Sequence, residues 1–181
     1  MRAVLCSGNP HKLEELGAAL PGWELALLDS DEYPAETGAT YFENAVGKAR
    51  YGREVGEATA WMLGEDSGIE VAALGGAPGL ESARWSERWL EELLERLVGT
   101  RNRTARYVCE LVALGPDGEE LRGSGILEGT IADAPRGSEG FGYDPIFVPA
   151  GETRTVSLQR GSTVRRVALI VAKSRSRRRS W

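Results

Sequence analysis

The sequence predicts an α/β fold with a mixed β-sheet. Apolar runs typical of strands alternate with helical patterns in the first half of the chain. Two longer strand-like runs, residues 104–114 and 119–131, are then joined by Gly115-Pro116-Asp117-Gly118, which is typical of a hairpin turn. The 181 residues, 41% of them hydrophobic, suffice for one domain or for two lobes that share one sheet. Alternating elements followed by a hairpin favour parallel and antiparallel strands together.

The individual elements are expected in a fixed order. Strands are predicted at residues 2–7, 23–28 and 60–63 because these runs are short and apolar. The first helix opens near Pro10, which suits a first helical position, and Pro21-Gly22 ends it. Helices at residues 41–55 and 85–98 follow from apolar residues at helical spacing. In the latter, Trp85 and Trp89 are interpreted as core or interface packing rather than as a base-stacking platform.

The stretch from Gly64 to Trp85 is the one around which the chain is organised. The strand at residues 60–63 is expected to end at Gly64, and Glu65 and Asp66 follow at once. Adjacent carboxylates at a strand end, in a glycine turn, suit a hard divalent cation such as Mg²⁺, which prefers oxygen ligands and keeps several waters. A polar turn that binds nothing is the alternative.

Composition restricts the class of protein. No apolar run is long enough to cross a membrane, and the N-terminus enters a strand directly instead of forming a signal peptide. Cys6 and Cys109 lie in apolar runs and are expected to be buried free thiols of a cytoplasmic protein. All 27 acidic residues precede residue 153, whereas the last 29 residues hold nine Lys or Arg. The acidic body argues against nucleic acid as a partner.

A phosphate site is predicted where the first strand meets the first helix. Backbone N–H groups at a helix N-terminus bind phosphate, and Lys12 adds a cation one turn in. The Walker motif GxxxxGK[ST] is absent. Asn9 could instead be a plain helix cap. The residues concerned are Ser7, Gly8, Asn9, Pro10, His11 and Lys12.

Charged and aromatic residues elsewhere extend this prediction. The charged residues are Glu36, Lys48, Asp66 and Arg84. Together with Lys12 they suggest a cleft that holds both cationic and carboxylate groups, as a Mg²⁺–triphosphate ligand requires. Glu43 and Asn44 are polar positions that could form a solvated helix face. The compact run Phe141-Gly142-Tyr143-Asp144-Pro145 could stack a base, or it could be a turn with a buried aromatic residue.

Four motifs, in order, resemble the inosine triphosphate pyrophosphatase family, which hydrolyses non-standard purine nucleoside triphosphates. Residues 7–15 are similar to its TGNxxKxxE, and residues 36–49 to its ETGxTFxENAxxKA. Residues 66–84 are similar to DSGLxVxALxGxPGxxSAR, and residues 140–147 to GFGYDPIF. The resemblance covers residues 2 to about 150, expected as one domain over residues 1–152.

The resemblance implies an elongated, two-lobed protein, usually a homodimer, with the nucleotide in a cleft between the lobes. It implies Mg²⁺-dependent hydrolysis of ITP, dITP or XTP to the monophosphate and pyrophosphate. Glu36 and Asp66 would hold the Mg²⁺, and Asp66 would also be the base for the attacking water. The phosphates would be bound by residues 7–12 and by Lys48, Ser67 and Arg84. The base and sugar would be framed by Phe141, Gly142, Tyr143 and Asp144.

This sequence departs from the family pattern at three places. Glu65 stands where the family often has Asp, although its longer arm could still reach the metal or its surroundings. The chain between Arg84 and Leu90 is shorter than in many members. The family's C-terminal Ser-His-Arg-Gly-Lys, which reads the 6-keto group, is missing. Because a codon string for residues 168–173 encodes that motif in another frame, we hypothesise that residues 153–181 are translated out of frame; a divergent tail is the alternative.

Two other functions compete with this reading. One is a pyrophosphatase for other damaged nucleotides, including pyrimidines. The other is a nucleotide-sensing or nucleic-acid-binding module that uses the Arg-rich tail, if the tail is genuine. Comparing the turnover of ITP with that of dUTP distinguishes a purine from a pyrimidine pyrophosphatase. Salt-dependent DNA binding without turnover would favour the nucleic-acid-binding module.

Overall fold

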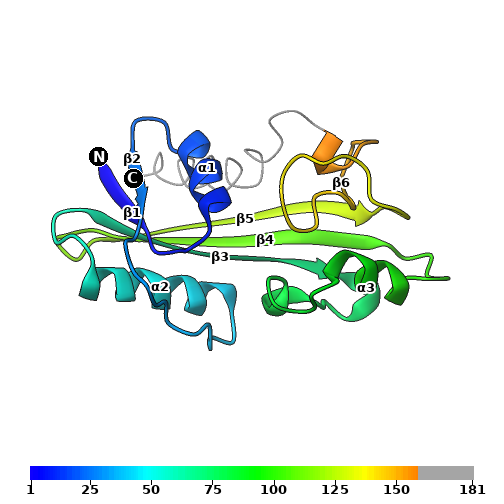
Figure 1. Ribbon diagram of the computed structural model, residues 1–181, viewed down its shortest axis with the longest axis horizontal. Coiled ribbons are helices and arrows are strands. Elements are labelled where there is room, and N and C mark those ends of the chain that lie inside the picture. The colour runs from blue at the N-terminus through cyan, green and yellow to red at the C-terminus, as the bar shows by residue number, and fades with distance from the viewer. Residues whose placement is uncertain (159–181) are drawn as a thin grey trace, which may run out of the picture. The chain divides into compact units, whose positions relative to one another are not determined.

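The computed structural model describes residues 1–158 and contains a six-stranded sheet with the order β2-β1-β3-β4-β5-β6 (Figure 1). β1 pairs in parallel with β2 and β3, whereas β5 and β6 pair antiparallel. The predicted α/β fold with a mixed sheet is therefore confirmed. The strands are β1 (Arg2–Leu5), β2 (Glu24–Leu27), β3 (Trp61–Val71), β4 (Thr104–Leu114), β5 (Glu120–Ile131) and β6 (Phe147–Pro149). The helices are α1 (Pro10–Ala19), α2 (Tyr41–Val55) and α3 (Trp89–Arg96), with 3₁₀ turns at Ala72–Leu74, Gly79–Glu81 and Val156–Leu158.

The described chain divides into two compact units. Unit 1 comprises residues 1–66 and 109–125, and unit 2 comprises residues 67–108 and the described residues from 126 onward. Within unit 1, helices α1 and α2 lie on opposite faces of the strands (Figure 1). Alternation along β1 explains this arrangement, because Ala3 and Leu5 pack with α1 whereas Val4 and Cys6 share a cluster with Tyr51 of α2.

β3 does not end at Gly64, so the predicted turn after residue 63 is wrong. The strand continues to Val71, and both carboxylates lie inside it. Gly64 is required by packing: a Cβ atom there would lie 1.9 Å from the carbonyl oxygen of Ala45 and 2.7 Å from the amide nitrogen of Ala49. The missing side chain lets the backbone of α2 approach the strand closely, which also brings polar side chains of α2 next to Asp66.

Unit 2 has its own hydrophobic core. It joins Ile69 and Val71 of β3 to Leu93 and Leu97 at α3 and to Phe147 of β6. The third helix is shorter than predicted, because residues 85–88 form a turn in which the Ser86 hydroxyl accepts the Arg88 N–H. Trp85 packs against this core, as predicted, with the Arg96 guanidinium 4.6 Å from its ring centroid; Trp89 is 40% exposed.

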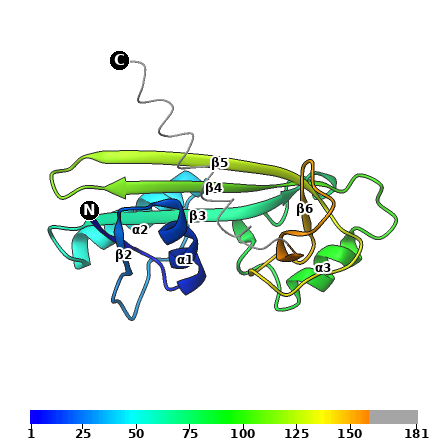
Figure 2. The same cartoon turned by 90° about the horizontal axis from the view of Figure 1, so that it is seen from above.

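The predicted hairpin joins β4 to β5, which run side by side (Figure 2). Its turn closes through the Gly115 N–H, which donates to the Glu119 carbonyl oxygen, and Gly118 adopts a positive φ of 83°.

Thr155, Val156 and Ser157 are buried in unit 2. The out-of-frame hypothesis covers residues 153–181, of which residues 159–181 lie outside the described residues. None of the described helices has the length and apolar character needed to span a membrane.

Candidate functional site

The first predicted site lies at the start of α1. Asn9 is the N-cap: its Oδ1 accepts the His11 N–H at 3.0 Å, and its own N–H donates to the Ser7 hydroxyl at 3.2 Å. Pro10 occupies the first helical position, as expected. The Asn9 side chain therefore acts as a helix cap, which is one of the two roles considered from the sequence. Gly8, Pro10 and His11 are exposed, so this helix start faces solvent.

Lys12 points from α1 to Glu65 of β3. Its ammonium lies 2.5 Å from Glu65 Oε2, and the Cys109 thiol donates to Glu65 Oε1 at 3.2 Å. Burial alone would lower the pKa of Lys12, but the charge and hydrogen bond of Glu65 outweigh it and raise that pKa above its ordinary value. Lys12 therefore carries a positive charge at neutral pH.

Asp66 points to the opposite face of β3, toward α2. Its Oδ2 accepts a hydrogen bond of 2.9 Å from Asn44 Nδ2, and Lys48 Nζ lies 3.4 Å from its Oδ1. Burial raises the pKa of the Asp66 carboxyl; Lys48 and Asn44 oppose the shift without cancelling it. A buried carboxylate with a raised pKa is better suited to accept a proton than an ordinary Asp.

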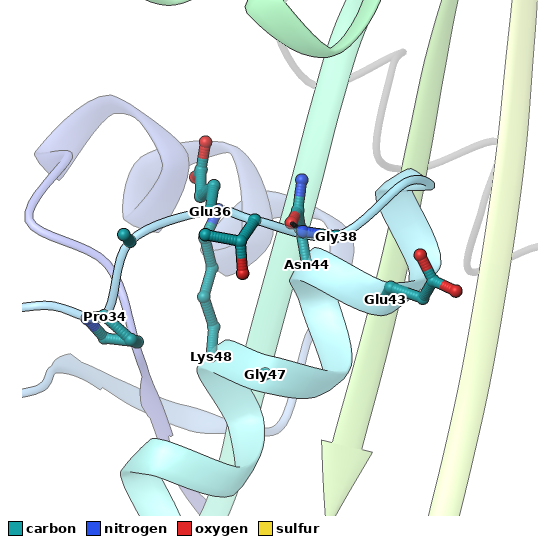
Figure 3. Close-up of a pocket in the computed structure, with 9 residues that line it drawn as sticks. Pro34, Glu36, Gly38, Glu43, Asn44, Gly47 and Lys48 are labelled. Atoms are coloured by element: carbon teal, nitrogen blue, oxygen red, sulfur yellow. Dashed lines mark hydrogen bonds and ion pairs between the residues drawn. The ribbon is translucent and has the colours of Figure 1, made fainter.

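Lys48 brings a second carboxylate to the same place. Its ammonium contacts Glu36, which lies in the loop before α2, and also donates to the Glu65 carbonyl oxygen at 2.9 Å. The loop and the first turns of α2 line a pocket that includes Glu36, Asn44 and Lys48 (Figure 3). Figure 3 shows Lys48 reaching from the helix toward Glu36, while Glu43 points away from both.

The carboxylates of Glu36 and Asp66 fit a hard cation. Both contact one ammonium, so both already converge on a single positive centre. Mg²⁺ is usually held by one or two carboxylates, with water and substrate phosphate completing its shell. Within residues 1–158 no group of three or more His, Cys, Asp or Glu side chains gathers as a metal site. Glu65, directed to the other face, is not part of this pair.

The remaining predicted residues belong to unit 2. Ser67 follows Asp66 on β3 and is partly buried. The Arg84 guanidinium makes a two-point contact with Glu81, at 2.7 and 3.0 Å, and its side chain is 42% exposed. Ser67 precedes the glycine turn at residues 75–79 in the sequence, and Arg84 follows it.

The loop at residues 141–144 is organised by Asp144. This side chain is fully buried and accepts hydrogen bonds from the Phe141 N–H at 3.0 Å and from the Tyr107 hydroxyl at 3.2 Å. Tyr143 is also buried; its hydroxyl donates to the Ser82 carbonyl oxygen, and burial raises its pKa to about 12. Phe141 and Gly142 are partly buried. The loop therefore presents Phe141 and Gly142, while Tyr143 and Asp144 hold it from inside.

Sequence reasoning missed Asn44. The sequence leaves open whether Asn44 belongs to a solvated helix face or to the charged cleft, and names no role for it; in the structure it is 4% exposed and bonded to Asp66. A signal was available: Asn44 and Lys48 are four residues apart and therefore lie on one face of α2. That face is the one that meets the carboxylates.

Comparison with solved structures places the chain in a known class. A Ham1 protein structure from Staphylococcus aureus has a TM-score of 0.79 and 31% identity, covering 98% of this chain and 100% of that one. A HAM1 protein from Coxiella burnetii has a TM-score of 0.80 and 30% identity, covering 98% and 97%. Both likenesses extend over nearly the whole chain, so the fold is that of Ham1 proteins.

The chain belongs to the Ham1 family, whose family model matches residues 3–162. A dITP/XTP pyrophosphatase from Thermus thermophilus is 47% identical over 167 residues, covering 84% of this chain and 79% of its own length. A dITP/XTP pyrophosphatase from Deinococcus deserti is 43% identical over 163 residues, covering 86% and 77%. The resemblance stated from four motifs is thereby confirmed, and so is the enzyme class, a nucleoside triphosphate pyrophosphatase.

Proposed function

We propose that this protein hydrolyses non-standard purine nucleoside triphosphates, namely ITP, dITP and XTP, to the monophosphate and pyrophosphate, with Mg²⁺ as cofactor. The observation that carries the proposal is the convergence of the Glu36 and Asp66 carboxylates on the ammonium of Lys48. Relatives that are dITP/XTP pyrophosphatases supply the substrate class. The homodimer and the cytoplasmic location stay predictions.

The basic side chains and the helix start bind the triphosphate in this proposal. The exposed N-terminus of α1 offers backbone N–H groups, and Lys12 brings a positive charge held next to Glu65. Lys48, Ser67 and Arg84 contribute further contacts to the phosphates. Phe141 and Gly142 border the base and sugar, and the buried Tyr143 and Asp144 keep their loop in shape.

Asp66 is the general base of the proposed reaction. Glu36 and Asp66 would hold Mg²⁺, which would neutralise phosphate charge and make the attacking water more acidic. The Asp66 carboxylate takes a proton from the attacking water, whose oxygen forms a bond to the α-phosphorus. The bond from that phosphorus to the bridging oxygen breaks, and pyrophosphate leaves with the electron pair. The Lys48 ammonium donates to Asp66 Oδ1 and orients that carboxylate.

The test is turnover by the full chain, with products identified by ³¹P NMR in ¹⁸O-labelled water. We expect hydrolysis of ITP, dITP and XTP in preference to ATP and dUTP. The label should appear in the monophosphate, because the water attacks the α-phosphorus. Label in the pyrophosphate would overturn the mechanism, and a preference for dUTP would favour a pyrimidine pyrophosphatase.

A further inference from the structure

The side-chain amide of Asn44 lies between the loop that carries Glu36 and the carboxylate of Asp66. Its Oδ1 accepts the Gly38 N–H at 2.8 Å, and its Nδ2 donates to Asp66 Oδ2 at 2.9 Å. Asn44 is 4% exposed, so water competes little for either bond. One buried side chain thus connects two segments far apart in the sequence. Figure 3 shows Asn44 beside Gly38 of the loop.

The two bonds fix the orientation of the amide. Its oxygen faces a donor, the Gly38 N–H, and its nitrogen faces an acceptor, the Asp66 carboxylate. Rotation of the amide by 180° would set donor against donor and oxygen against carboxylate. Asn44 therefore holds Asp66 Oδ2 in place, while Lys48 contacts Oδ1.

The loop is fitted to α2 at neighbouring positions as well. The Ala39 and Thr40 N–H groups both donate to Glu43 Oε2, at 2.6 and 3.1 Å. A Cβ atom on Gly38 would lie 2.7 Å from Asn44 Oδ1, so the glycine permits the close approach of backbone and amide. Three successive backbone N–H groups are thus accepted by side chains of the first turn of α2. Glu36, two residues before Gly38, is anchored by this arrangement.

We infer that Asn44 is a positioning residue that couples the Glu36 loop to Asp66. The inference rests on the proposed function, since it assigns Asn44 to the same reaction. With both bonds present, the two carboxylates keep the separation at which they meet Lys48. With either bond lost, the two carboxylates are linked only through Lys48, and each gains freedom to move. If Asn44 had only a structural role, its replacement would change the stability of the fold but not the relative positions of the Glu36 and Asp66 carboxylates.

Two substitutions separate the two bonds. Asn44→Asp keeps an acceptor for the Gly38 N–H but removes the donor to Asp66, whereas Asn44→Ala removes both. Arg50→Ala is the control, because Arg50 is an exposed residue of the same helix and lies outside the site. The measurements are kcat and KM with ITP, titration with Mg²⁺ alone, and hydrogen exchange of the Gly38 amide. Circular dichroism checks that each variant is folded.

We expect Asn44→Asp to lower kcat about 10–100-fold, the usual cost of losing a partner that orients a metal ligand, with KM changed far less. Gly38 should remain protected from exchange in that variant. Asn44→Ala should lose the protection, lower kcat and weaken Mg²⁺ binding. Arg50→Ala should match the wild type in every measurement.

The inference is overturned if Asn44→Asp keeps wild-type kcat, or if Gly38 exchanges freely in the wild type. Should Asn44→Ala not fold, these two results still decide the question. A wild-type protein that hydrolyses none of the nucleotides would refute the proposed function instead. The coupling would then still be judged from Gly38 exchange and from Mg²⁺ titration of Asn44→Asp.

Discussion

Glu65 and Asp66 are neighbours on β3, yet they have different surroundings. Glu65 faces α1, where its carboxylate meets the Lys12 ammonium at 2.5 Å and the neutral thiol of Cys109. Asp66 faces α2, where it shares the Lys48 ammonium with Glu36 and accepts a bond from Asn44. The strand itself produces the difference, because consecutive side chains point to opposite faces.

The comparison shows how one strand can place two neighbouring carboxylates in two different electrostatic environments. On the α1 face a carboxylate raises the pKa of a lysine and keeps it charged, which suits phosphate binding. On the α2 face two carboxylates meet one ammonium, so the charges of Glu36, Asp66 and Lys48 sum to a net negative charge. In the proposed function, Glu65 therefore lies on the phosphate-binding side of the site, and Asp66 on the side of the cation and of proton transfer.

The largest expected effect is that of Asp66→Asn compared with Glu65→Gln. Asp66→Asn should lower kcat on the order of 10³-fold or more, because base catalysis alone contributes 10²–10⁴-fold and a metal ligand is lost as well. Glu65→Gln should act mainly through Lys12, with a smaller loss that appears in KM. Steady-state kinetics with ITP measures both, and equal losses would remove the distinction between the faces. An Asp66→Asn enzyme with a tenth of wild-type activity would contradict the assignment of the base.

The second prediction separates phosphate binding from metal binding. Lys12→Ala should raise KM for the triphosphate more than Glu36→Gln does, because Lys12 meets anions and Glu36 meets the cation. Glu36→Gln should instead raise the Mg²⁺ concentration needed for half-maximal activity, and excess Mg²⁺ should restore part of its activity. Rate measurements over a Mg²⁺ series test this. If added Mg²⁺ rescues both variants equally, the two roles are wrongly divided.

Much of this fold could be predicted because local patterns agree with the tertiary structure. Helix α2 has the predicted bounds, Tyr41–Val55, since Thr40 and Glu43 form a capping box and apolar residues recur at helical spacing. The β4–β5 turn was predicted from its Gly-Pro-Asp-Gly sequence. The charged site residues could be named because they lie in motifs, and the structure brings Glu36, Lys48 and Asp66 together.

The errors arose where a tertiary contact overrides a local signal. Gly64 was interpreted as the end of a strand, but its missing side chain serves the packing of α2 on β3. No role could be predicted for the Asn44 side chain, because nothing in its own helix indicates that Asp66, 22 residues later, accepts its bond. Close backbone approach and buried amide pairing depend on residues distant in the sequence, so local patterns cannot identify them.

The third prediction tests the packing that separates the two faces. Gly64→Ala should lower the free energy of unfolding by about 1–3 kcal/mol or more, because the new Cβ overlaps backbone atoms of Ala45 and Ala49 that cannot move aside singly. Gly17→Ala, in α1, is the matched control: a Cβ there meets nothing within 4 Å. That variant should be stabilised by up to about 1 kcal/mol through helix propensity. Urea denaturation measures both. If Gly64→Ala is as stable as the wild type, the close packing of α2 on β3 does not require this glycine.

The smallest expected effect comes from the thiols, one on each face. Burial raises the pKa of Cys6 from 9.0 to about 11; burial, reinforced by the Glu65 carboxylate, raises that of Cys109 well above its ordinary value. Above pH 9 the unfolded chain loses thiol protons that the folded protein retains, so stability falls as pH rises from about 9 toward 11. Each pKa unit corresponds to about 1.4 kcal/mol.

Cys6→Ala should therefore reduce the loss of unfolding free energy between pH 8 and pH 10 by about 1 kcal/mol. Urea denaturation at the two pH values tests this, and an unchanged pH dependence would mean that the Cys6 thiol ionises as readily in the folded protein as in the unfolded chain.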